Sequence, residues 1–354
     1  MNKTRILTSI NWFALALIMI ISSACEQTAG KQGADNKPLS SAKVIQKVSI
    51  GIQVSPAMAL VMIAKDKGFF LEEGLDVELQ EFTAGKFALQ AFLSGAIDFA
   101  VSGEVPVVLA ALQGNQIRVV TQVVERTNNE VRVVAHREKD LLQADKYFKK
   151  KKRKLATSFG GGPEFFTYTF LKHFNIDQKQ IEILSQKPED MPAALATGSV
   201  DAIAIFDPFA YIAENRLGSS GITFSEPTLY SELYVLNANP SQIENKPQII
   251  EAMIRALDKA GHFIDQDPES SKLIVQKYTR LDRSVIDGIW NNFVFRPSLT
   301  QTLIDYWYAQ ATWAKETGKI TSDTIIPDFK KMLEPKFLEK INPTAVKLNE
   351  IKKQ

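Results

Sequence analysis

Cysteine and histidine are scarce in this sequence of 354 residues, which contains one cysteine, Cys25, and three histidines. A single cysteine cannot form a disulfide within the chain. His136, His173 and His262 share no spacing typical of metal ligands, and no second cysteine is present to join them. We therefore predict no metal site and no cofactor, and we propose no catalytic residue.

An excess of charge of one sign is also missing. The formal net charge is +2, and Lys3 and Arg5 lie in a segment that we expect to be removed, which leaves the chain close to neutral. Because nucleic-acid-binding proteins need a concentrated positive field, the sequence predicts no nucleic-acid partner. The basic run at 149–154, KKKKRK, is expected to be a solvated loop or helix face.

The N-terminal apolar run is too short to span a membrane. It covers residues 12–21 (WFALALIMII), whereas a spanning helix needs about 20 residues. The positive residues before this run and the small residues 22–24 after it are typical of a secretory signal peptide. We therefore expect residues 1–24 to be a signal peptide, and the protein to be exported.

Cys25 directly follows the small residues that end this segment. The arrangement resembles a bacterial lipobox, in which the cysteine is lipidated, typically with palmitate, and becomes the first residue of the mature protein. Ser22 departs from that pattern, and a plain signal peptide cleaved near Ala24 is the alternative. Residues 25–45 are rich in Gly, Ser, Lys and Gln, which favours a flexible tether between the lipid and a folded domain.

From residue 48 onward, strand and helix patterns alternate. Strands are expected at 48–53, 75–79 and 97–101, and helices at 56–67 and 87–93. This alternation predicts an α/β fold whose parallel strands are joined by crossover helices. The last third of the chain is predicted to be mainly helical, with helices at 247–265, 268–278, 283–291, 299–317 and 326–333.

A weak internal repeat indicates two similar lobes. AFLSGAID at 91–98 aligns without gaps with ALATGSVD at 194–201, and each copy has a helix that ends at a glycine before a strand. Extending the alignment places Glu104 opposite Asp207. The alternative is that helix–glycine–strand junctions are common in any α/β protein.

The chain is expected to cross between the lobes twice. The first crossing is predicted within 121–137 and the second near 221–224, with a hinge near 124–130 and 221–226. The predicted boundaries are 46–126 plus 224–354 for lobe 1 and 127–223 for lobe 2.

Five strand–helix junctions can form a ligand site. In open α/β sheets, ligands bind outside the carboxyl ends of the strands, where helix N-termini expose N–H groups. The junctions are expected at 55–56, 83–85, 102–104, 158–164 and 207–208. Helix capping explains each of them taken singly, because Ser55 and Asp207 are good N-caps before proline. Gly160, Gly161 and Gly162 make the clearest candidate for an N–H cradle.

Three of these junctions carry an acid, namely Glu104, Glu164 and Asp207. If two of these carboxylates face the cleft, they repel a purely anionic ligand and pair with an amine or an aminopyrimidine group. The alternative for Glu164 is a role in its helix alone, because acids are favoured in a first turn.

Four segments resemble one known family. They are AKDKGFFLEEGLDVEL (64–79), ALQAFLSGAIDFAV (88–101), GNQIRVVTQV (114–123) and AALATGSVDAIAIFDPF (193–209). They are similar to the nitrate/sulfonate/taurine-type solute-binding proteins of ABC importers, a group that includes binders of thiamine pyrimidine precursors. The resemblance implies a periplasmic-binding-protein fold with two lobes and two crossovers (type II), here with a helical C-terminal part.

The family resemblance also implies a site, a set of partners and a location. The ligand-binding residues it implies are Gln53, Ser55, Thr83, Ser102, Glu104, Ser158, Gly161, Glu164 and Asp207. The implied protein is a monomer that captures a small polar organic molecule, such as a sulfonate, taurine or an aminopyrimidine, and delivers it to an ABC permease with its ATPase. It acts in the periplasm or at the cell surface, anchored to a membrane by its lipid. The stretch KKKKRKLAT departs from the family pattern, which weakens the alignment over 145–157.

Two other functions remain open. One is an enzyme on the same fold, similar to the thiamine-pyrimidine synthases. Those enzymes carry a cysteine-rich motif and the related desulfinases use a cysteine nucleophile, whereas the only cysteine here is at the lipobox, so we predict no enzyme. The other is a solute sensor that contacts a signalling receptor, which the sequence does not separate from a transporter subunit.

Overall fold

The computed structural model describes residues 45–127 and 131–349, all within one compact unit of the chain, Lys43–Gln354. The predicted signal peptide, Cys25 and the tether up to residue 44 lie outside the described residues. None of the described helices combines the length and the apolar character needed to cross a membrane.

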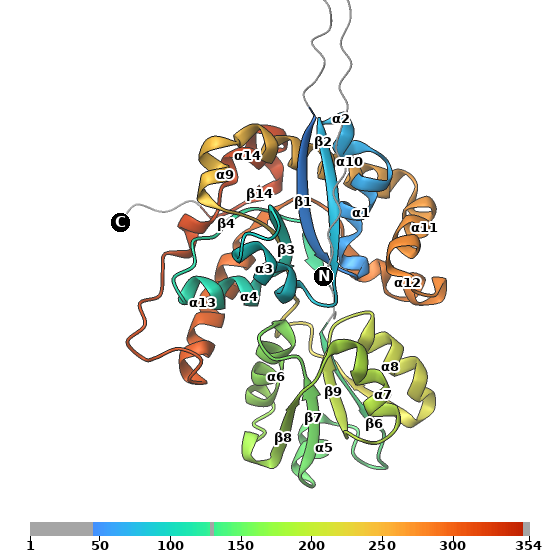
Figure 1. Cartoon of the computed structure of the whole chain (residues 1–354). Coiled ribbons are helices and arrows are strands. Elements are labelled where there is room, and N and C mark those ends of the chain that lie inside the picture. Colours follow the sequence, from blue (N-terminus) through green and yellow to red (C-terminus); the bar gives the residue numbers. More distant parts are fainter. Residues whose placement is uncertain (1–44, 128–130, 350–354) are drawn as a thin grey trace, which may run out of the picture. The chain divides into compact units, whose positions relative to one another are not determined.

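A five-stranded sheet, here called the first sheet, has the strand order β2-β1-β3-β11-β4. Its strands are β1 (Gln46–Gln53), β2 (Leu75–Phe82), β3 (Phe99–Gly103), β4 (Arg118–Gln122) and β11 (Tyr234–Ala238). β1 pairs in parallel with β2 and β3, whereas β11 is antiparallel to β3 and β4. The predicted parallel pairing is therefore confirmed for the first three strands (Figure 1).

The second five-stranded sheet has the order β10-β6-β9-β7-β8. Its strands are β6 (Arg132–His136), β7 (Arg153–Thr157), β8 (Ile181–Ser185), β9 (Ala202–Ile205) and β10 (Gly221–Phe224). β7 is parallel to β8 and β9, and β6 is antiparallel to β9 and β10. Two small ladders complete the pairing: β5 (Arg126–Thr127) with β12 (Phe293–Val294), and β13 (Leu299–Thr300) with β14 (Val346–Lys347).

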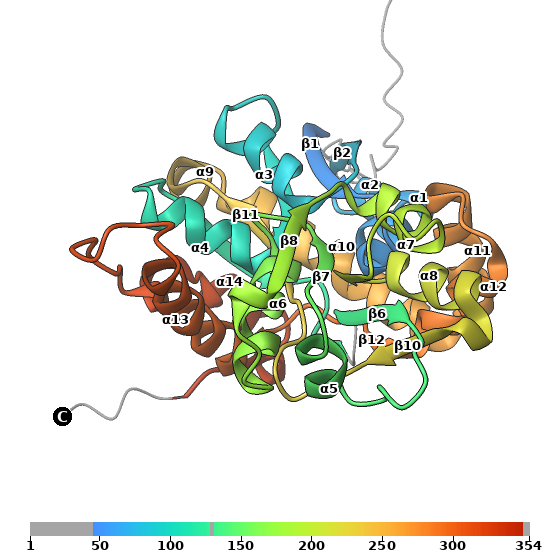
Figure 2. The ribbon, with the colours of Figure 1, turned by 90° about the horizontal axis from the view of Figure 1, so that it is seen from below.

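Helices join and cover the strands (Figures 1 and 2). In the first part of the chain they are α1 (Ala59–Asp66), α2 (Phe69–Glu72), α3 (Gly85–Leu93), α4 (Glu104–Leu112), α5 (Ala144–Lys149), α6 (Gly162–His173), α7 (Met191–Ala196) and α8 (Phe209–Leu217). The C-terminal part contains α9 (Pro240–Asn245), α10 (Pro247–Gln266), α11 (Pro268–Thr279), α12 (Arg283–Ile289), α13 (Gln301–Glu316) and α14 (Pro335–Ile341). Short 3-10 turns lie at Pro56–Met58, Gln178–Gln180, Pro188–Asp190, Gly218–Ser220, Trp290–Asn292, Phe329–Met332 and Pro343–Ala345. The predicted helical C-terminal part is confirmed, and α10 to α13 correspond to four of its five predicted helices. The fifth, at 326–333, is wrong: only the 3-10 turn Phe329–Met332 lies there, and the sequence does not predict α9 or α14.

Two connections link the sheets, 123–131 and 225–233. The sequence places the second crossing near 221–224, but this segment pairs with β6 as strand β10. Burial explains the difference, because Phe224 is 6% exposed and its ring packs against those of Tyr147 and Phe148. The described connection therefore begins after Phe224. The predicted lobe boundaries and hinge residues stay predictions.

The internal repeat has a structural counterpart in two aspartates. Asp98 Oδ2 accepts a hydrogen bond from the backbone N–H of Ser49 at 2.8 Å, and Asp201 Oδ2 accepts one from the backbone N–H of Lys154 at the same distance. In each sheet, therefore, the aspartate before one strand ties down a neighbouring strand. The glycine three residues earlier has positive φ in both copies, +77° and +73°, as a helix C-terminus requires.

Candidate functional site

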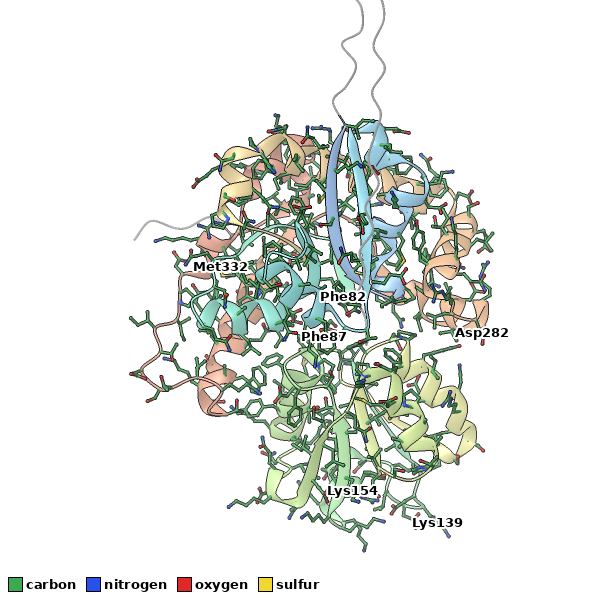
Figure 3. All side chains as sticks on the ribbon, viewed as in Figure 1. Phe82, Phe87, Lys139, Lys154, Asp282 and Met332 are labelled. Carbon is green, nitrogen blue, oxygen red and sulfur yellow. The ribbon has the colours of Figure 1, made fainter. Side chains whose placement is uncertain are left out.

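A small cavity lies where the carboxyl ends of strands from both sheets meet. Its volume is about 20 Å³, close to the space that one water molecule needs, about 10–15 Å³. The residues that line it are Gln53, Ala84, Gly85, Lys86, Gly103, Pro106, Ser158, Gly161, Pro163, Phe206 and Glu232. Figure 3 shows Phe82 and Phe87 near this end of the first sheet and Lys154 at the opposite end of β7 from Ser158.

Lys86 joins the two sides of the cavity. It lies in the first turn of α3, and its Nζ donates to the carbonyl oxygen of Phe159 at 2.7 Å and to Ser158 Oγ at 3.3 Å. Burial lowers the pKa of Lys86, although the nearby charge of Glu164 opposes this change. Sequence analysis missed Lys86, which follows the expected Thr83-Ala84-Gly85 junction directly.

Of the residues predicted to bind ligand at the end of the first sheet, one lines the cavity and the others do not. Gln53 lines the cavity: its Oε1 accepts from the Gly85 N–H at 3.0 Å and its Nε2 donates to the Tyr234 hydroxyl at 3.2 Å. Ser55 is an N-cap, as predicted, because its hydroxyl accepts from the Ala57 N–H at 3.3 Å. Ser102 Oγ accepts from a buried asparagine, and Thr83 is exposed; neither lines the cavity.

Glu104 is fully buried in the first turn of α4. Its carboxyl accepts hydrogen bonds from the Tyr230 hydroxyl at 2.6 Å, from Gln310 Nε2 at 2.9 Å and from the Leu233 N–H at 2.9 Å. Burial raises the pKa of Glu104 to about 7, against the opposing effect of these hydrogen bonds. Glu104 is therefore a buried carboxyl with a raised pKa, and it is not among the residues that line the cavity.

Glu232 was missed by sequence analysis and lines the cavity. It lies in the second connection and is 4% exposed. Its carboxyl accepts from the Tyr234 hydroxyl at 3.0 Å and from the backbone N–H of Gly162 on the opposite side. Burial, followed by the charge of Glu104, raises the pKa of Glu232 to about 8. No motif marks this position, because it follows no strand of the predicted pattern.

The glycine-rich junction at the start of α6 contributes Ser158 and Gly161 to the cavity. Two of its N–H groups donate to carboxylates of the chain itself: Gly162 N–H donates to Glu232, and Gly160 N–H donates to Glu164 Oε2 at 2.7 Å. Glu164 also accepts from Lys319 Nζ at 2.6 Å. Rather than lining the cavity at Ser158, Glu164 faces a second cavity of about 170 Å³, beside Trp313 and Lys319.

Asp207 is buried in an ion pair, and it does not line the cavity. Its Oδ1 lies 2.9 Å from Arg132 Nη2, and its Oδ2 accepts from Asn292 Nδ2 at 3.2 Å. Burial raises the pKa of Asp207, although the charge of Arg132 opposes this change. The predicted capping role of Asp207 is confirmed in part: α8 begins at Phe209 after Pro208, and Asp207 Oδ1 accepts from the backbone N–H of Tyr211 in its first turn at 3.2 Å.

The cavity as a whole presents buried hydrogen-bonding groups. Within the described ranges, no cluster of three or more His, Cys, Asp or Glu side chains could hold a metal ion. The cavity combines an amide, a hydroxyl, an amine and a carboxyl with glycine backbone and one aromatic ring, Phe206. Such groups can bind and orient a small polar molecule.

The model of the NMT1-like family matches residues 42–278, and the chain belongs to this family. The chain is 23% identical over 255 residues to a putative aliphatic sulfonates-binding protein of Bacillus subtilis. This match covers 71% of this chain and 75% of the relative. It is 27% identical over 227 residues to the taurine-binding periplasmic protein of Escherichia coli, covering 61% and 66% of the two chains.

Among solved structures, the periplasmic aliphatic sulphonate-binding protein SsuA of Escherichia coli superposes with a TM-score of 0.70. The match has 18% identity and covers 81% of this chain and 97% of that one. This likeness confirms the predicted α/β, two-lobe periplasmic-binding-protein fold.

A methyl group on Gly162 should destabilise the protein. A Cβ there would lie 2.4 Å from the Tyr230 hydroxyl and 2.7 Å from Glu232 Oε1, so both buried side chains would have to move. We expect Gly162→Ala to cost about 1–3 kcal/mol of unfolding free energy, measured by urea denaturation. Gly161→Ala is the control, because the nearest atom to its Cβ is 3.6 Å away; equal losses in both variants would contradict the close packing around Gly162.

Glu104 should make stability depend on pH. Its pKa, about 7 in the folded protein, is raised from the usual 4.5, so the folded state binds the proton more tightly than the unfolded state. At low pH the carboxyl is protonated in both the folded and the unfolded state, so no charge is buried on folding. The free energy of unfolding then decreases as the pH rises through the folded pKa. We expect wild type to lose stability relative to Glu104→Gln between about pH 5 and pH 8, measured by thermal unfolding. A constant difference between the two proteins across this range would contradict the raised pKa.

Proposed function

We propose that this protein is the extracytoplasmic solute-binding component of an ABC importer. The cavity at the carboxyl ends of strands from both sheets carries the proposal, because this is where α/β folds bind ligands. The relatives support it, since they are named as a sulfonates-binding and a taurine-binding periplasmic protein. The proposed cargo is a small polar organic molecule of the sulfonate, taurine or aminopyrimidine type.

The proposed mechanism is capture between two lobes. Each lobe is built around one of the two five-stranded sheets, and the lobes move about the two connections between the sheets. The cavity wall supplies polar contacts to the ligand from four side chains, those of Gln53, Lys86, Ser158 and Glu232. The cavity of about 20 Å³ is too small for such a ligand, so the lobes must separate before one enters. A permease with its ATPase then accepts the cargo from the liganded form, and the protein itself performs no chemistry on it.

A ligand screen tests the proposal. The purified full-length chain is heated with taurine, an alkanesulfonate, nitrate, bicarbonate, an aminopyrimidine, thiamine or riboflavin. A ligand that binds only the folded state at 100 times its Kd adds about 2.7 kcal/mol, which raises the melting temperature. We expect at least one such increase.

Variants locate the binding. Ser158→Ala removes a hydroxyl from the cavity wall and should weaken the affinity for the ligand found several-fold, as the loss of one hydrogen bond predicts. Ser94→Ala, at the exposed end of α3, is the matched control and should bind as wild type does. No shift with any compound, or equal effects of both variants, would count against a solute site in this cavity.

The proposal includes a lipid anchor at Cys25, which rests on the sequence alone. Palmitate labelling in a bacterial host should mark wild type and not Cys25→Ser, since the hydroxyl of serine does not replace the thiol in this modification. Wild type should also sediment with membranes, whereas the variant stays in the soluble exported fraction. Equal labelling of the two proteins would contradict lipidation at Cys25.

A further inference from the structure

The glycine-rich start of α6 is a natural place for an anionic group, because its N–H groups lie at a helix N-terminus beside the cavity. In the structure, carboxylates of the chain itself already accept from two of these donors. Gly160 N–H donates to Glu164, and Gly162 N–H donates to Glu232. A ligand sulfonate that bound to either of these two N–H groups would have to displace a carboxylate.

Two glycines, one from each sheet's side, hold the Glu232 carboxyl in place. A Cβ on Gly103, at the end of β3, would lie 2.6 Å from Glu232 Oε1, and a Cβ on Gly162 would lie 2.7 Å from the same atom. Only residues without a side chain allow the carboxyl to approach both backbones this closely. With Tyr234 donating at 3.0 Å, the carboxyl is fixed at the cavity wall.

A second carboxyl, that of Glu104, lies close enough to Glu232 for their charges to interact. Glu104 is fully buried, and its described hydrogen-bond partners, Tyr230, Gln310 and the Leu233 N–H, are all neutral. The charge of Glu104 acts on Glu232, and burial raises the pKa of both carboxyls. Because both pKa values are raised, the pair is partly protonated near neutral pH, and a ligand group that brings positive charge or N–H donors favours its ionised form, whereas an anion disfavours that form. Lys86, the cation that lines the same cavity, already donates to Ser158 Oγ and to the carbonyl oxygen of Phe159.

We propose that Glu232 determines which solutes this protein accepts. It selects solutes that present a cationic or multiply N–H-donating group to the cavity, such as an amidinium, a guanidinium or an aminopyrimidine. It discriminates against solutes whose only charged group is a sulfonate. The inference rests on the proposed solute-binding function. It predicts a solute preference different from the sulfonate binding that the names of the relatives indicate. Taurine carries both an amine and a sulfonate and therefore falls between the two classes of solute.

Calorimetric titration of the full-length chain tests the inference with three probes: agmatine and 4-aminopyrimidine as donors of N–H groups, and ethanesulfonate as the anion. Wild type should bind at least one N–H-donating probe 10-fold or more tightly than ethanesulfonate. Glu232→Gln should weaken that probe at least 10-fold and bind ethanesulfonate more tightly than wild type does. The ratio of the two affinities is the readout, so a moderate loss of stability in the variant does not imitate the effect.

Matched variants complete the experiment. Glu226→Gln removes a carboxyl from the same connection outside the cavity wall and should leave the ratio unchanged. Glu104→Gln is a second variant, expected to change the ratio in the same direction as Glu232→Gln and by less. Thermal unfolding without ligand shows whether each variant is folded.

The outcomes separate the two proposals. A wild type that prefers ethanesulfonate, or a Glu232→Gln ratio within twofold of wild type, would overturn the role of Glu232 and leave the solute-binding function standing. If neither these probes nor any compound in the wider screen binds, the solute-binding function fails, and the inference fails with it.

Discussion

The fold depends on how backbone N–H groups at strand–helix junctions are satisfied. Each helix N-terminus leaves N–H groups without partners in its own helix, and burying them unpaired is costly. This chain meets the requirement with its own side chains: Gln53 for Gly85, Glu164 for Gly160 and Glu232 for Gly162. Two of these groups, Gln53 and Glu232, also line the cavity, so there the groups that complete the backbone are those that a ligand would contact.

Much of the fold could be predicted from sequence because it depends on local sequence patterns. Glycines 95 and 198 end helices with positive φ, and the aspartates three residues later anchor neighbouring strands, so the short repeat corresponds to a real structural unit. The sequence predicts the long amphipathic helices of the C-terminal part, from α10 to α13, almost residue for residue. A helical period of apolar residues that continues over such lengths distinguishes helix from strand even where single residues do not.

The site was less predictable because its key contacts join residues far apart in the chain. Asp207 follows its strand as expected, but its carboxyl pairs with Arg132, which no local pattern associates with it. The basic run at 149–154 is expected to be solvated, yet Arg153 is 1% exposed, and its guanidinium stacks on Tyr147 and pairs with Glu138. Glu232 has no sequence signature at all, since its position depends on how the second connection packs between two glycines.

The place of Glu232 in the chain adds a mechanical consequence. It belongs to the segment that runs from β10 of one sheet to β11 of the other, and β11 begins two residues later. Any rotation of one sheet against the other must be absorbed by backbone torsions in the two connections. In the proposed mechanism, a solute bound by this carboxyl would therefore act directly on the segment about which the lobes turn, without transmission through the core.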